Sequence, residues 1–294
     1  ELRESIKKYA RETLGANGEF DVLPTIGSKE MVALLPFLLE AKRILIPKIA
    51  YPTYRVGGLL AKAEVIEVDI DPSNWPTKDI DLVWLNTPSN PTGRVHSEGE
   101  MRAVVDWSRA HGITIASDEC YLPFPDKKSG TSILKIAEGD NKNLVALHSL
   151  SKRSNLAGYR AAFVVGDSAI ISKLLEIRKH MGMMVPLPVQ RAMSLALADE
   201  IHVGQQAELY RNRRGRLARA LTDNGFKIED SESGLYIWCT RGESDWESVA
   251  WFADRGIIVT PGNFYGEAGN KHIRIALTAT DAKIDEAATR IGLK

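Results

Sequence analysis

Cysteine is scarce in this chain: only Cys120 and Cys239 occur among its 294 residues. The two lie far apart in the sequence and match no metal-ligand spacing, which excludes a disulfide framework and a cysteine-based zinc site. Two isolated thiols are typical of packed side chains in a reducing compartment. We therefore expect a cytoplasmic protein without a metal centre.

An excess of charge is also absent, because 38 Lys and Arg residues balance 38 Asp and Glu residues. General nucleic-acid binding depends on clustered positive charge, which this balance does not favour. The longest apolar run, residues 31–39, is too short to cross a bilayer and contains Pro36. We therefore expect neither nucleic acid nor a membrane as a partner.

Hydrophobic residues make up 44% of the chain, and short apolar segments alternate with helical patterns such as 98–111. This alternation predicts an α/β fold in which a mostly parallel sheet is covered by helices on both faces. The expected strands are 21–27, 43–48, 64–69, 81–86, 113–118, 144–150 and 161–167.

The pattern changes after residue 168, where a long helical region continues to about Leu221. Short strands then follow at 226–230, 234–240, 257–262 and 272–279, with a helix near 246–255 and a last helix. We predict a large domain at 1–180, a connecting helical region at 181–221 and a small α+β domain at 222–294. The chain opens on an amphipathic helix that we expect to end at Gly15, and we expect the natural protein to have a segment ahead of Glu1.

Lys152 is the most informative residue, because it follows Ser149 and Ser151 and comes eight residues before Arg160. A lysine must be unprotonated to attack a carbonyl, and a nearby guanidinium disfavours its charged form. Serine hydroxyls and a guanidinium also make a phosphate cradle. An amine nucleophile beside a phosphate site suits pyridoxal phosphate. For Lys152 alone, a basic solvated loop is the structural alternative.

Polar residues follow several expected strands, and ligands of open α/β sheets bind at that edge. Ser28 and Lys29 open a helix, where free N–H groups favour a phosphate, although Ser28 also suits a helix N-cap. Asn90 lies in the turn sequence 90–93. It could donate to the phenolic oxygen of a pyridine cofactor, or it could serve the turn alone.

Asp118 ends the strand 113–118, where a carboxylate could hold a protonated pyridine nitrogen and keep the ring an electron sink. Tyr121 could reach the same phenolic oxygen as Asn90, and capping and packing are the structural alternatives. Tyr51 could stack on a flat ring or pack in the core. Arg274 lies among apolar residues and needs a partner, either a substrate carboxylate or a structural salt bridge.

Together and in this order, these segments resemble the class I/II aminotransferases of the aspartate aminotransferase superfamily, over essentially the whole chain. The resemblance implies the fold type I of pyridoxal-phosphate-dependent transferases, with amino acids and 2-oxo acids as substrates. It also implies a homodimer with a shared active site. Relatives carry several dozen residues ahead of the helix at Glu1, including an interface tyrosine and an arm that covers the substrate, so we expect such a segment here too.

The resemblance also assigns roles to the candidate residues. Lys152 would bind the cofactor covalently and move the proton, and Asp118 would bind the pyridine nitrogen. Asn90 and Tyr121 would bind the phenolic oxygen, Asn90 would also face the substrate, and Tyr51 would stack on the ring. The remaining residues would bind the substrate α-carboxylate (Arg274) or the phosphate (Ser28, Lys29, Ser149, Ser151 and Arg160).

More narrowly, the residues around Lys152 and the segment 26–30 look like those of actinobacterial N-succinyldiaminopimelate aminotransferases, which serve lysine biosynthesis. We expect glutamate and 2-oxoglutarate as one substrate pair and an N-succinylated amino-keto pimelate as the other acceptor. Two alternatives stay open, because one fold supports several reactions. They are another enzyme with this cofactor, such as a C–S lyase, and the cofactor-sensing domain of a transcription regulator.

Overall fold

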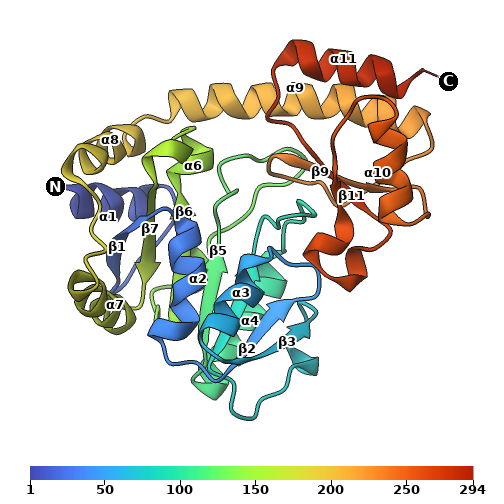
Figure 1. Cartoon of the computed structure of the whole chain (residues 1–294). Helices are drawn as coiled ribbons and strands as arrows, with labels where there is room; N and C mark the ends of the chain where they lie inside the picture. The colour runs from blue at the N-terminus through green and yellow to red at the C-terminus, as the bar shows by residue number, and fades with distance from the viewer. Residues whose placement is uncertain (294) are drawn as a thin grey trace.

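A seven-stranded sheet forms the larger part of the computed structural model, which describes residues 1–293 (Figure 1). Its strand order is β1-β7-β6-β5-β4-β2-β3, and β7 alone runs antiparallel to its neighbours. The strands are β1 (Asp21–Ile26), β2 (Arg43–Pro47), β3 (Glu64–Val68), β4 (Leu82–Asn86), β5 (Thr114–Asp118), β6 (Leu144–Ser149) and β7 (Ala161–Gly166). This arrangement confirms the predicted α/β fold with a mostly parallel sheet.

Helices cover both faces of this sheet because successive strand residues point to opposite sides. On β4, Val83 and Leu85 join one hydrophobic cluster, whereas Leu82 and Trp84 join the other. The first cluster is completed by α1 (Leu2–Glu12), α4 (Glu98–His111), α5 (Ile133–Ile136) and α8 (Leu187–Leu197). The second is completed by α2 (Ser28–Leu38), α3 (Thr53–Leu60) and α7 (Ser168–His180).

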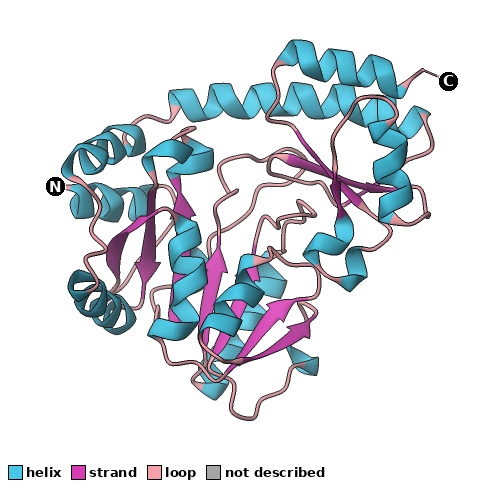
Figure 2. Ribbon diagram, viewed as in Figure 1, coloured by secondary structure: helices cyan, strands magenta, loops and turns pink. Residues whose placement is uncertain are grey.

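A smaller antiparallel sheet with the order β10-β11-β9-β8 follows the long helix α9 (Ile201–Asp223) in the chain and lies beside it, as Figure 2 shows. Its strands are β8 (Lys227–Glu229), β9 (Tyr236–Thr240), β10 (Thr260–Pro261) and β11 (Ile273–Ala276). A third hydrophobic cluster joins this sheet to α9, α10 (Asp245–Ala253) and α11 (Asp281–Ile291). The same cluster includes Cys120, Tyr121 and Phe124 from the segment after β5, so the core of the predicted small unit continues into the larger one.

Two sequence predictions of local structure were wrong. Helix α1 ends at Glu12 rather than at Gly15. Thr13 is its C-cap, and Gly15, with a positive φ of 72°, lies in the segment that follows. The expected strand 257–262 is reduced to the two residues of β10. Val259 and Pro261 are buried there and Ile258 is fully exposed, so the segment has one buried face, but only Thr260 and Pro261 pair with β11.

The predicted domain boundaries at residues 180 and 221 stay a prediction. Helix α8 packs against α1, whereas α9 packs against α11, so the two helices of the connecting region contact different units. Lys294, the last residue of the predicted small domain, lies outside the described residues. None of the helices in residues 1–293 combines the length and the apolar character that a membrane span requires.

Candidate active site

A cavity of about 550 Å³ lies between the two sheets, and its volume suits a small molecule. All eleven residues predicted from the sequence line it: Ser28, Lys29, Tyr51, Asn90, Asp118, Tyr121, Ser149, Ser151, Lys152, Arg160 and Arg274. The sequence analysis missed six further lining residues: Pro52, Cys120, Ala157, Tyr236, Phe264 and Tyr265. The structure therefore brings the predicted set together, while the role of each residue stays a prediction.

Lys152 lies on α6 (Leu150–Arg153), a helix of only four residues that follows β6. Ser149 is its N-cap, and the Ser149 Oγ accepts a hydrogen bond of 3.2 Å from the Ser151 backbone N–H. A helix this short is not stable by itself in water. The position of Lys152 therefore depends on the contacts that hold α6 from outside.

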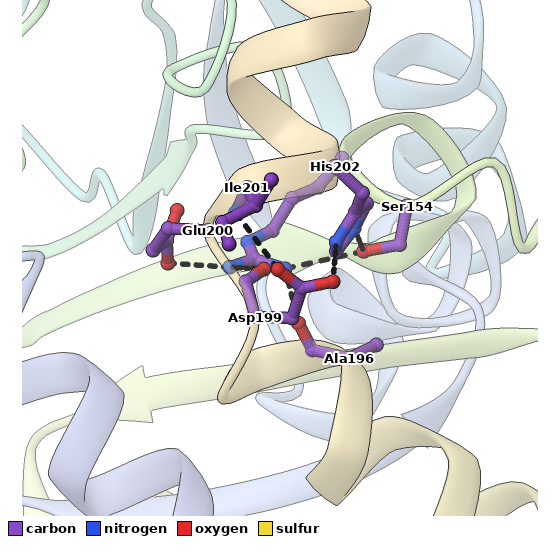
Figure 3. Close-up of polar contacts among 7 residues, drawn as sticks. Ser154, Ala196, Asp199, Glu200, Ile201 and His202 are labelled. Atoms are coloured by element: carbon purple, nitrogen blue, oxygen red, sulfur yellow. Dashed lines mark hydrogen bonds and ion pairs between the residues drawn. The ribbon is translucent and has the colours of Figure 1, made fainter.

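Arg153, the residue after Lys152, makes the first of these contacts, and Figure 3 shows its partners Ala196 and Glu200. Arg153 is 3% exposed and donates to the Ala196 carbonyl oxygen at 2.7 Å and to the Glu200 carboxylate at 2.5 Å. Its guanidinium also lies 5.0 Å from the centre of the Tyr9 ring. Arg153 therefore ties the helix that carries Lys152 to α1, to the end of α8 and to the start of α9.

A second contact of the same kind involves Ser154 and His202 (Figure 3). The His202 Nε2 lies 2.9 Å from the Ser154 Oγ, and its Nδ1 lies 2.9 Å from the Asp199 carboxylate. The imidazole thus bridges the end of α6 and the residues that precede α9. Both residues that follow Lys152 are held by the junction between α8 and α9.

The predicted phosphate end of the cavity forms where α2 begins. Gly27, with φ of 73°, is the N-cap of α2, so the N-cap interpretation of Ser28 was wrong and Ser28 is the first helical residue. A glycine is favoured there because a φ of 73° with a ψ of 156° strains any residue with a Cβ, and a Cβ would also overlap the Arg160 guanidinium. Arg160 is oriented by a 2.7 Å bond from its Nη1 to the Ala157 carbonyl oxygen. Free N–H groups and a guanidinium thus meet as an anion site.

Asp118 ends β5 and is 7% exposed. Burial raises the pKa of the Asp118 carboxyl, and hydrogen bonds from Cys120 and from the Tyr54 hydroxyl lower it. The Tyr54 hydroxyl donates to Asp118 Oδ2 at 2.9 Å. A buried carboxylate is unfavourable without a cationic partner, and a protonated pyridine nitrogen would provide one. The sequence analysis missed Tyr54.

Asn90 is positioned by Asn86, the last residue of β4. The Asn86 side chain donates to the Asp118 carbonyl oxygen at 2.9 Å and accepts from the Asn90 backbone N–H at 2.7 Å. The expected turn is present, with Gly93 donating to the Ser89 carbonyl oxygen at 2.8 Å. Because Asn86 contacts both β5 and the turn, Asn90 and Asp118 are held in one arrangement.

Arg274 reaches the cavity from β11 of the small sheet. Its Nη1 donates to the Asn90 Oδ1 at 2.8 Å, and its guanidinium lies 3.9 Å from the centre of the Tyr236 ring. The Nε of Arg274 is buried and has no hydrogen-bond partner within residues 1–293. The Asn90 amide and the rings of Tyr236 and Tyr265 contact this side chain, and the vacant donor matches the predicted substrate carboxylate.

Tyr121 contacts a second tyrosine that the sequence analysis missed. Its hydroxyl oxygen lies 3.1 Å from the hydroxyl oxygen of Tyr236, and both side chains are buried. Burial raises the pKa of Tyr121 well above its ordinary value, so its phenol keeps its proton and can donate. This donor lies in the same cavity as Asp118 and Lys152.

The residues present fit pyridoxal phosphate at each part of that molecule. The cavity offers an amine, a buried carboxylate for the ring nitrogen, phenol and amide groups for the phenolic oxygen, and the anion site at α2 for the phosphate. Within residues 1–293, no group of three or more His, Cys, Asp or Glu is placed to hold a metal ion.

Known proteins give an independent comparison. The sequence pattern of the family described as "Aminotransferase class I and II" matches residues 1–291. A probable aminotransferase of Mycobacterium tuberculosis is 48% identical over 99% of this chain and 71% of its own length. The 4-dedimethylamino-4-oxo-anhydrotetracycline transaminase OxyQ of Streptomyces rimosus is 46% identical over 99% of this chain and 82% of its own.

Solved structures agree with this family assignment. A probable N-succinyldiaminopimelate aminotransferase of Thermus thermophilus superposes with a TM-score of 0.91 at 27% identity, over 99% of this chain and 83% of that chain. The superposition confirms the predicted fold type I, and the family match confirms the resemblance seen in the sequence. The chain belongs to the class I and II aminotransferases, a family of enzymes that depend on pyridoxal phosphate.

Proposed function

We propose that this aminotransferase moves an amino group between glutamate and an N-succinylated amino-keto pimelate. The observation that carries the proposal is the buried, vacant Nε of Arg274, which lies in the same cavity as Lys152 and Asp118. A guanidinium held by Asn90 and by a ring, with a free donor, is suited to an α-carboxylate. Glutamate and N-succinyldiaminopimelate, the two proposed amino donors, both carry an α-carboxylate beside the carbon that bears the amino group.

Each side chain has a distinct task in this proposal. Pyridoxal phosphate, when bound, supplies the electron sink that makes the Cα proton acidic. The Lys152 amine accepts that proton and returns it, and Arg274 orients the substrate so that its Cα–H faces Lys152. The Asp118 carboxylate keeps the ring nitrogen positively charged. Tyr121 donates a hydrogen bond to the phenolic oxygen.

The choice of acceptor is supported by the likeness to the Thermus thermophilus protein, a probable N-succinyldiaminopimelate aminotransferase. The second carboxylate of such a substrate needs a cation, and Lys29 lines the cavity with its Nζ 5.7 Å from the centre of the Tyr51 ring. Lys29 is therefore placed to meet a distal carboxylate.

A polycyclic ketone is a second candidate acceptor, because a specific feature of the cavity favours it. Tyr51, Phe264 and Tyr265 line the cavity, and Phe264 is 57% exposed. Aromatic side chains offer flat surface on which a fused ring system can stack. The relative OxyQ is named for such a substrate.

Half-reactions test the proposal directly. The purified protein loaded with pyridoxal phosphate is mixed with glutamate, with N-succinyl-LL-2,6-diaminopimelate or with alanine, and its visible absorbance is followed. We expect the band to be lost rapidly with the first two donors and slowly with alanine, and to return with 2-oxoglutarate. Release of pyruvate and ammonia from a cysteine conjugate would instead indicate a C–S lyase. Binding without amino exchange would indicate a sensing domain.

A homodimer and a cytoplasmic location are parts of the same proposal. Phe37, Leu59 and Leu60 expose more than half of their surface on α2 and α3, and such an apolar face is typical of a subunit interface. Cys120 and Cys239 are both free and buried, which suits a reducing compartment. Sedimentation equilibrium of the protein tests the dimer. A monomer at all concentrations would contradict that part.

A further inference from the structure

Tyr236 begins β9, on the small sheet next to the strand that carries Arg274. Trp238 pairs directly with Arg274 across β9 and β11, and Tyr236 lies two residues before Trp238. Residues two apart on a strand share a face, so Tyr236 and Arg274 are diagonal neighbours on the same face of the sheet. This placement brings the phenol ring to the guanidinium.

The ring of Tyr236 fixes one side of the Arg274 fork. The guanidinium carbon lies 3.9 Å from the ring centre, within the range of a cation–π contact. The Asn90 amide oxygen takes the Nη1 at 2.8 Å. With the ring against one face and the amide at one end, the Nε side of the fork is left for a carboxylate.

The hydroxyl of Tyr236 contacts Tyr121, the residue that we expect to bind the phenolic oxygen of the cofactor. It lies 3.1 Å from the Tyr121 hydroxyl, 115 positions away in the sequence, and either oxygen is placed to donate. Each phenol has a single proton. If Tyr121 donates to Tyr236, Tyr121 has none left for the phenolic oxygen of the cofactor. If Tyr236 donates, the Tyr121 proton is free, and accepting a bond makes Tyr121 a stronger donor.

The backbone around Tyr236 is held by buried hydrogen bonds from α9. Arg214 donates to the Tyr236 carbonyl oxygen at 2.5 Å and to the Gly234 carbonyl oxygen at 2.6 Å. Arg214 is itself 5% exposed. The strand therefore presents the phenol from a fixed support, as a residue that sets the geometry of its neighbours requires.

We propose that Tyr236 is a positioning residue that links the substrate clamp to the cofactor site. Its ring orients the Arg274 fork, and its hydroxyl donates to Tyr121, so that the Tyr121 proton points at the phenolic oxygen of the cofactor. The inference rests on the proposed function, because it needs a bound cofactor and a carboxylate substrate. Tyr236 would join the small sheet to the segment that follows β5 through one side chain.

Tyr236→Phe tests the hydroxyl alone, because the ring against Arg274 is kept. An electron-rich phenolic oxygen stabilises the proton on the lysine-bound nitrogen. A hydrogen bond from Tyr121 withdraws electron density from that oxygen and so makes the proton easier to lose. Weakening that donor should therefore raise the midpoint of the visible-band pH titration by about half a unit. The titration uses the loaded protein without substrate, and the KM for glutamate should stay within about twofold.

Tyr210→Phe is the matched control, because it removes a phenol hydroxyl from the same hydrophobic cluster but outside the cavity. Its titration midpoint should equal that of the wild type. Tyr236→Leu removes the ring as well, and it should raise the KM for both glutamate and 2-oxoglutarate by about five- to tenfold, an effect that phenylalanine rescues.

Two results would overturn the inference: a titration midpoint in Tyr236→Phe equal to that of Tyr210→Phe, or an unchanged KM in Tyr236→Leu. Failure of the proposed function looks different. In that case the wild-type protein itself loses no visible band with any amino donor.

Discussion

At the scale of single residues, the cavity contains charged groups that lack an oppositely charged partner within residues 1–293 and gain one when a ligand binds. Asp118 is a buried carboxylate that two hydrogen bonds stabilise but do not neutralise. Arg274 is a cation with a vacant, buried donor. Groups of this kind cost folding free energy and are retained where function requires them.

Asp118→Asn should separate stability from function. The amide keeps much of the shape but loses the charge that holds the ring nitrogen protonated. Amino exchange should fall by about three orders of magnitude, or about 4 kcal/mol of transition-state stabilisation. The cofactor-free variant should unfold at a temperature at least as high as the wild type, because a buried charge is gone. Single-turnover kinetics within tenfold of the wild type would refute the assigned role.

His96 gives a test of pH dependence outside the cavity. Burial lowers its pKa from 6.5 to about 4, with Arg94 adding to the effect, and its Nδ1 is buried without a hydrogen-bond partner among the described residues. Since the unfolded chain binds a proton between these two values and the folded protein does not, stability should fall as the pH drops from 6.5 towards 4. The loss should be about 2 kcal/mol between pH 7 and pH 4.5.

His96→Gln should remove most of that loss, and His180→Gln, which replaces a side chain that is 74% exposed, should not. Urea unfolding of the three proteins at pH 7 and at pH 4.5 gives the comparison. Equal acid destabilisation in all three would mean that groups other than His96 dominate.

At the scale of elements, the central strands β4, β5, β6 and β7 of the large sheet were predicted well because each is an almost continuous buried run. The predicted 113–118 is β5 (Thr114–Asp118), and the predicted 144–150 is β6 (Leu144–Ser149). Parallel strands covered on both faces are apolar throughout, and this pattern is visible in the sequence. The short β10 was overpredicted, because the apolar run 257–261 has a buried face but only Thr260 and Pro261 pair with a neighbouring strand.

The start of α2 gives a prediction at this scale. Gly27→Ala should weaken binding of pyridoxal phosphate by about tenfold or more, because the new Cβ displaces the Arg160 guanidinium and removes a charge-assisted hydrogen bond. The end of a flexible side chain can move, so the variant should still fold. Cofactor affinity is measured by the visible band on titration.

Gly112→Ala is a close control for that variant. Gly112 also has a positive φ of 68°, but its ψ of 26° lies in the left-handed helical region, where alanine should cost about 1 kcal/mol, and a Cβ would meet nothing within 4 Å. Gly27→Ala should lose more stability than Gly112→Ala, because the ψ of 156° at Gly27 suits glycine alone, and only Gly27→Ala should lose cofactor affinity. Equal cofactor affinity in the two variants would show that Arg160 does not contribute to the phosphate site.

At the scale of the whole molecule, the cavity is built by contacts between segments far apart in the chain. The Tyr54 hydroxyl reaches Asp118 over 64 positions, and Arg274 reaches Asn90 over 184. The eleven candidates could be predicted from the sequence because each lies in or next to a recognisable strand or turn. Tyr54 and Tyr236 also lie in or near such strands, but the sequence does not show their partners, which are set by strand order and by the position of the small sheet.

Arg274→Lys tests the contact between the two sheets. Lysine keeps the charge but loses the bidentate fork and the flat face that lies on Tyr236. The KM for glutamate and for 2-oxoglutarate should rise about tenfold or more, a loss of about 1.4 kcal/mol. The affinity for pyridoxal phosphate should change little. A parallel loss of cofactor affinity would show that Arg274 has a structural role instead.

The central claim is that Lys152 is the nucleophile of this cavity, and one measurement addresses it directly. Lys29 also lines the cavity, so the two lysines compete as candidates. The protein loaded with pyridoxal phosphate is reduced with borohydride, digested and mapped by mass spectrometry, with Lys152→Ala and Lys29→Ala as companions. The account predicts modification at Lys152 in the wild type and in Lys29→Ala, and none in Lys152→Ala. Stable modification at Lys29 in the wild type would contradict it.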